Sequence, residues 1–94
     1  MNLRFNVNPE TGLPHIYDHG VQEYEVQDVL DDPGDVKRDR RGLRIAIGQT
    51  RGGRYLQVIY RLEQASGVAF IITAYDPNNS ALDAFRRRRR RRGR

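Results

Sequence analysis

The spacing of apolar residues changes from a helical to a strand period at about residue 35. Before that point Val26, Val29 and Leu30 fall on one helical stripe. Acidic side chains occupy the first turns of this segment, where the helix dipole favours them, and Pro33 and Gly34 follow it. The pattern predicts a helix over about residues 22–31.

Alternating apolar positions then predict four strands in succession. The stretches are DVKRD, LRIAIGQT, RYLQVIYRL and GVAFIITAY. Glycine-containing pairs at 41–42, 52–53 and 66–67 separate them, and each connection is short enough for a hairpin. We therefore expect an antiparallel meander of four strands.

Two further segments flank this region. LRFNV near the start alternates and predicts a short strand, and DPNNSALDAF predicts a second helix with Ser80 as its cap and with Leu82 and Phe85 facing the sheet. The order β-α-β-β-β-β-α indicates a single α+β domain over residues 1–85, a small antiparallel sheet with helices packed on one face. Residues 86–94 form an arginine-rich C-terminal tail, either a helical extension of that helix or disordered.

Alternation along the strands also predicts which side chains share a face. We expect the face away from the core to carry the alternate residues Arg44, Ala46, Tyr55, Gln57, Ile59 and Arg61. On this interpretation Arg44 and Arg61 lie on the same face as Tyr55.

The net charge of +5 is unevenly distributed along the chain. Residues 1–36 sum to −7, residues 37–61 to +7, residues 62–85 to −3 and the tail to +8. A nucleic-acid partner is thus suggested by two separate features, the basic middle segment and the tail. The chain contains no cysteine, which excludes disulfides, thiolate metal sites and a cysteine nucleophile. No long apolar run or signal-peptide pattern occurs, so we expect a cytoplasmic protein without membrane contact.

The segments HGVQEYEVQDVLDDP, GQTRGGRYLQVIYR and IITAY resemble the BrnT family of toxins from bacterial type II toxin–antitoxin pairs. They are also similar to a neighbouring family of small uncharacterised domains. The resemblance covers roughly residues 14–75. It implies a compact fold like that of the RelE ribonucleases, a cognate DNA-binding antitoxin as partner, and metal-independent cleavage of RNA that inhibits translation.

Metal-independent RNA cleavage needs a base, an acid and a cation at the phosphate. His19 is the candidate acid or base, and Tyr75 is a candidate for proton transfer. The candidate phosphate-binding side chains are Arg44, Arg54 and Arg61. Each has a structural alternative: a turn for His19, surface salt bridges for the arginines and sheet packing for Tyr75. His15 and His19 lack a third ligand at a convincing spacing, so we predict neither a metal site nor a cofactor.

A non-catalytic module is the alternative function. It would bind RNA, other nucleic acid or an acidic protein through Lys37, Arg38, Arg40, Arg41, Arg51, Arg86, Arg87, Arg88, Arg89 and Arg90. Three differences from the toxins favour it: Asp18 replaces a common lysine, and Phe70 and Tyr75 replace common arginines. The tail could also fold back on the acidic stretch of residues 10–35. A homodimer paired through exposed strand edges is a third hypothesis.

Overall fold

The computed structural model describes the backbone of residues 2–92 and the side chains of residues 2–89, and shows an α+β fold with a five-stranded mixed sheet. The elements in chain order are β1 (Leu3–Phe5), the 3₁₀ helix η1 (His15–His19), α1 (Glu23–Asp31), β2 (Asp35–Arg38), β3 (Leu43–Gln49), β4 (Tyr55–Leu62), β5 (Ala69–Tyr75) and α2 (Asn79–Arg92). The side chain of Arg90, a predicted nucleic-acid contact, lies outside the described set, as do residues 93 and 94 of the predicted tail.

The strands lie in the order β1-β5-β4-β3-β2, and the predicted four-stranded antiparallel meander is confirmed for β2 to β5. Its three turns contain glycines at positive φ, namely Gly42, Gly53 and Gly67. The prediction of a wholly antiparallel sheet is wrong, because β1 pairs with β5 in parallel. This pairing joins the first and last strands, and no hairpin turn in the sequence could have signalled it.

The predicted distribution of side chains over the two faces is wrong for β3. Arg44 lies directly opposite Tyr60 and Ala46 opposite Val58, so both lie on the face that carries the core. The turn between β3 and β4 pairs the odd-numbered residues of β3 with the odd-numbered residues of β4. Leu43, Ile45 and Ile47 therefore share the other face with Arg61, Ile59, Gln57 and Tyr55.

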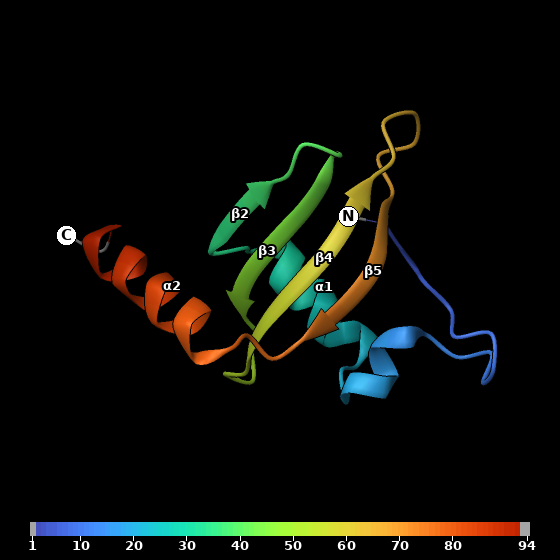
Figure 1. The fold of residues 1–94 in the computed structure, drawn as a ribbon, viewed down its shortest axis with the longest axis horizontal. Coiled ribbons are helices and arrows are strands. Elements are labelled where there is room, and N and C mark those ends of the chain that lie inside the picture. Colours follow the sequence, from blue (N-terminus) through green and yellow to red (C-terminus); the bar gives the residue numbers. More distant parts are fainter. Residues whose placement is uncertain (1, 93–94) are drawn as a thin grey trace.

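The core lies between α1, η1 and one face of the sheet. Val26, Val29 and Leu30 of α1 are buried there, as the helical stripe predicts. Gly48 allows the helix to approach β3 closely, since a Cβ at this position would lie 3.2 Å from Cγ1 of Val29. No helix lies in front of the other face in Figure 1, and we call it the open face.

The second helix does not share a face with the first, so the prediction of helices packed on one face is wrong. Ala81 in the first turn of α2 lines a hollow of about 160 Å³ with open-face residues that include Ile45 and Gln57. From there α2 runs past the β2 edge and away from the body (Figure 1). Apolar contact is limited to the first turns of α2, because the arginines that follow cannot be buried unpaired.

Two contacts hold α2 beside β2. Phe85 is completely buried, and its ring lies 6.0 Å from that of Tyr55 and against Gly34. One turn later Nη2 of Arg88 lies 2.6 Å from Oδ2 of Asp35. The helix is capped by Asn78, whose Oδ1 accepts a 2.8 Å hydrogen bond from the N–H of Ala81, and not by the predicted Ser80.

Candidate functional site

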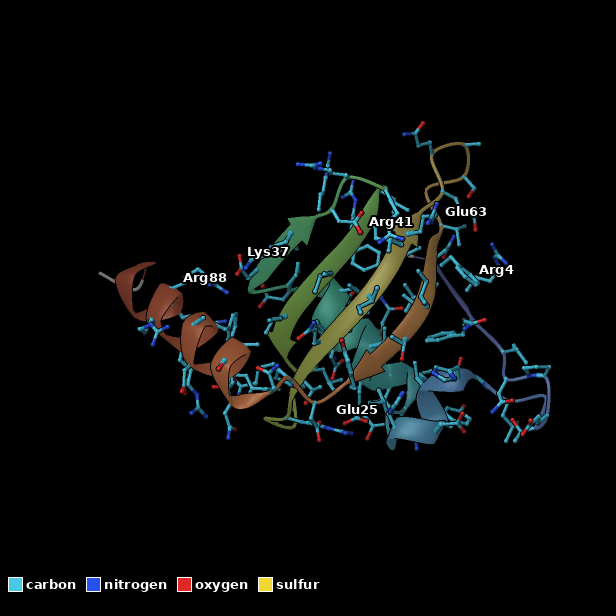
Figure 2. The ribbon with its side chains drawn as sticks, viewed as in Figure 1. Arg4, Glu25, Lys37, Arg41, Glu63 and Arg88 are labelled. Atoms are coloured by element: carbon cyan, nitrogen blue, oxygen red, sulfur yellow. The ribbon has the colours of Figure 1, made fainter. Side chains whose placement is uncertain are left out.

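The five predicted catalytic residues separate to opposite ends of the sheet. We call the end where β4 begins and β5 finishes the clasp end, and the end at the β2–β3 turn of residues 39–42 the hairpin end. His19, Arg54 and Tyr75 come together at the clasp end. Arg44 and Arg61 lie at the hairpin end on opposite faces. Figure 2 shows the two ends through Glu25 at one and Arg41 at the other.

Arg54 fastens three segments together at the clasp end. Its Nε donates to Oδ1 of Asp76 at 2.9 Å, and its Nη1 donates to the carbonyl of Gly20 at 2.8 Å and to Oε1 of Glu25 at 3.0 Å. Partial burial acts to lower the pKa of Arg54, but hydrogen bonds and charge from Asp76 and Glu25 outweigh it and raise the pKa above its usual value. The guanidinium is therefore charged and held by internal partners on two of its three nitrogens. Within the described residues Nη2 has no partner.

Three rings lie next to this arginine. The imidazoles of His15 and His19 are 5.2 Å apart between centroids, and His19 is 6.0 Å from the ring of Tyr75. Asp18 accepts a hydrogen bond from Asn8 and lies 3.5 Å from Nδ1 of His15. An imidazole and a phenol thus lie side by side, a combination that can transfer protons.

The hairpin end carries basic side chains that form no ion pair with an acidic side chain among residues 2–89. Arg38 and Arg44 lie directly opposite each other on β2 and β3, an arrangement in which like charges repel. The nearby acid is Asp39, and its Oδ1 accepts hydrogen bonds from the backbone N–H groups of Arg41 and Leu43. That carboxylate shapes the turn. Among the described residues it makes no ion pair with the arginines around it.

Basic side chains elsewhere in the body are paired. Arg4 binds Glu63 at 2.6 Å, and Arg51, a predicted nucleic-acid contact, lies 3.7 Å from Asp28. By contrast, nine basic side chains have no ion pair within residues 2–89. They are Lys37, Arg38, Arg40, Arg41, Arg44 and Arg61 at the hairpin end and along β2, and Arg86, Arg87 and Arg89 on α2. Lys37 of β2 and Arg88 of α2 lie on the same side of the molecule in Figure 2, so both elements carry basic residues at the β2 edge.

Two arginines of α2 stack on rings. The guanidinium of Arg86 lies 5.1 Å from the centre of the Tyr55 ring, and that of Arg89 lies 5.7 Å from the Phe85 ring. Arg88 differs from both because it binds Asp35, as expected if the tail folds back on the acidic stretch. The predicted tail contacts therefore divide into one internal ion pair and several available cations.

Sequence reasoning did not find the partners of Arg54. Glu25 stands three residues after Gln22 in a capping box, and its Oε1 accepts the backbone N–H of Gln22 at 3.0 Å. The three-residue spacing of Gln22 and Glu25 is typical of a capping box, but it does not predict the ion pair between Glu25 and Arg54. Asp76 follows β5 directly, and only the sheet register brings it to Arg54.

Comparison with known proteins finds no matching family model, curated protein or solved structure. Within the described residues no group of three or more His, Cys, Asp or Glu side chains is placed to hold a metal ion. No helix in that part of the chain is long and apolar enough to cross a membrane.

Proposed function

We propose that this protein binds the phosphate backbone of nucleic acid, RNA in particular, through the hairpin end and α2. The observation that carries the proposal is the cross-strand pair of Arg38 and Arg44, which have no acidic partner among the described residues. Like charges placed opposite each other reduce stability, so an external anion is the simplest compensation. Arginine suits this ligand because its planar fork matches phosphate oxygens.

Salt-dependent binding tests the proposal. We expect a fluorescein-labelled RNA 12-mer to bind with an affinity that falls steeply with salt, as measured by fluorescence anisotropy. Replacing Arg38→Gln and Arg44→Gln together should weaken binding and reduce the slope of log K against log salt by about one for each arginine. Arg51→Gln is the matched control, because Arg51 already pairs with Asp28. A double variant indistinguishable from this control would contradict the proposal.

A second candidate, a BrnT-like ribonuclease toxin with a RelE-like fold, is favoured by the grouping of His19 and Tyr75 at the clasp end. In this proposal one of the two groups, His19 or the Tyr75 hydroxyl, accepts the proton of the attacking 2′-hydroxyl. The other donates a proton to the leaving 5′-oxygen. The unpartnered Nη2 of Arg54 is the cation available to the phosphate there. An antitoxin would then be the partner that restrains the activity.

Cleavage can be separated from binding. We expect single-stranded RNA to be cut in the presence of a chelator, giving 2′,3′-cyclic phosphate ends, and His19→Gln and Tyr75→Phe to abolish cutting while RNA binding persists. Tyr24→Phe is the control, because Tyr24 is exposed on the outer side of α1. RNA that stays intact while bound to the wild-type protein removes the toxin candidate and leaves the binding proposal standing.

A further inference from the structure

A group of three side chains occupies the open face at the clasp end. Gln57 on β4 lies directly opposite Tyr75 on β5, and its Nε2 is 3.4 Å from the Tyr75 hydroxyl. Tyr55 lies two residues before Gln57 and therefore on the same face, diagonal to Tyr75, at a Cα separation of roughly 7–8 Å. All three are half-buried, and the start of α2 lies beside two of them, with Phe85 against Tyr55 and Ala81 in the same hollow as Gln57.

The ring of Tyr55 already stacks with a planar group of α2. The guanidinium of Arg86 is stacked 5.1 Å from its centre, which shows that one face of this ring is turned away from the core. Arg86 is exposed and has no ion pair among the described residues, so it can move to a phosphate when another planar group takes its place. The ring of Tyr75 lies 6.0 Å from the imidazole of His19, measured between ring centres, and the two planes are tilted relative to each other.

The chemistry of this group suits a nucleobase. Tyrosine rings offer stacking surfaces to any base, and an amide such as that of Gln57 can both donate to and accept from a base edge. Unpaired cations lie on two sides of this group, since Arg61 shares the open face towards the hairpin end and Arg86 and Arg89 lie on α2. A phosphate backbone bound by these cations would cross the open face.

We propose that Tyr55, Gln57 and Tyr75 form a nucleobase-binding subsite for single-stranded nucleic acid. This inference rests on the proposed function and narrows it to a class of ligand. In a duplex the flat faces of the bases are covered by their neighbours in the stack, so only a single strand can place a base against these rings. Phosphates then lie on the arginines and a base lies on the tyrosines.

The test compares ligands at one salt concentration. We expect a labelled uridine 12-mer and its deoxythymidine counterpart to bind more tightly than a blunt duplex of the same length. Tyr55→Leu and Tyr75→Leu should each weaken single-strand binding about tenfold and leave duplex binding unchanged. Tyr24→Leu, on the outer side of α1, is the matched control.

The outcomes separate the subsite from the function on which it rests. Equal affinity for single strand and duplex, with Tyr55→Leu and Tyr75→Leu behaving like Tyr24→Leu, overturns the subsite while the Arg38 and Arg44 effects still support phosphate binding. Poly-glutamate or uridine monophosphate competing as well as the 12-mer would equally overturn it, since the subsite requires both a base and a chain of phosphates. Circular dichroism confirms the fold of each variant, and Tyr75→Leu carries the test if Tyr55→Leu unfolds.

Discussion

Arg54 connects more of the structure than any other described arginine. It joins the start of β4 to the η1–α1 junction at Gly20, to α1 at Glu25 and to the residue after β5, Asp76. These are the segments that position His19 and Tyr75. Arg54, which the sequence suggests as a phosphate ligand, therefore also holds the segments of the clasp end together.

Replacing Arg54 should destabilise the protein. Arg54→Gln leaves the buried Glu25 carboxylate with fewer donors, and we expect the free energy of unfolding to fall by about 1–3 kcal/mol. Urea denaturation measures the change. Arg51→Gln should cost less than 1 kcal/mol, since the Arg51 side chain is 84% exposed. Equal effects of the two substitutions would mean that the Arg54 contacts are as weak as a surface pair.

Tyr17 should titrate above the usual pKa of a tyrosine. Its hydroxyl donates a 2.7 Å hydrogen bond to Oε2 of Glu23, and this bond, with slight desolvation and the Glu23 charge, raises the pKa of Tyr17 above 10.0. The folded-state pKa exceeds the unfolded one, so the contribution to stability is present below pH 10 and is lost as the pH rises through the folded value.

Ultraviolet absorbance at high pH tests this expectation. Tyr17→Phe should remove a phenol titration step that lies above pH 10 in the wild-type protein, whereas Tyr24→Phe should leave that step in place. If both variants lose the same step, the hydrogen bond to Glu23 does not form in solution.

The second helix combines a packed start with a charged continuation. Phe85 is buried and Arg88 is paired, but arginines follow one another at every position from 86 to 92. Like charges four residues apart on a helix repel by a few tenths of a kcal/mol each. The helix is therefore anchored at its first turns and electrostatically strained towards its end.

Single arginines of α2 should differ in their effect on stability. Arg88→Gln removes the 2.6 Å ion pair with Asp35 and should lower the free energy of unfolding by up to about 1 kcal/mol. Arg87→Gln removes an unpaired cation and should have no effect or raise stability slightly. Thermal unfolding at low salt measures both, and the difference should shrink at 1 M salt. Identical melting temperatures would show that α2 is not held at Asp35.

The elements could be predicted where local pattern decides them. The stripe of Val26, Val29 and Leu30 located α1, and glycine pairs located the hairpins. Parallel pairing of β1 depends on contacts between residues about 66 positions apart, and the alignment of Arg44 with Tyr60 depends on turn geometry, so neither could be derived from alternation. In the candidate site, the proximity of His19 to Tyr75 depends on the same long-range register. The residue types alone identify both as candidates, but they do not predict that the two side chains lie together.

Across the whole molecule the two signs of charge are segregated. Acidic residues dominate positions 1–36, which include α1 behind the sheet, and unpaired cations occupy the hairpin end and α2. A polyanion would be repelled from the acidic α1 and attracted to the hairpin end and to α2. Its approach is therefore oriented before any specific contact forms, and this steering weakens with salt.

Gly34 has no side chain, and the Phe85 ring of α2 occupies the space that a methyl group at this position would need. A Cβ there would overlap the Phe85 ring, so Gly34→Ala should displace the ring and cost about 1–3 kcal/mol, while Gly52→Ala has room and serves as the control. Trypsin cleavage within the arginine series should become faster in the first variant only. An unchanged rate would indicate that the ring adapts in place.

These two alanine variants are also an isoelectric pair of identical composition. They differ in where the arginines of α2 are held, not in how many there are. Comparing their nucleic-acid affinities therefore separates what the amount of charge contributes from what its placement contributes, a distinction that truncating the arginine series cannot make.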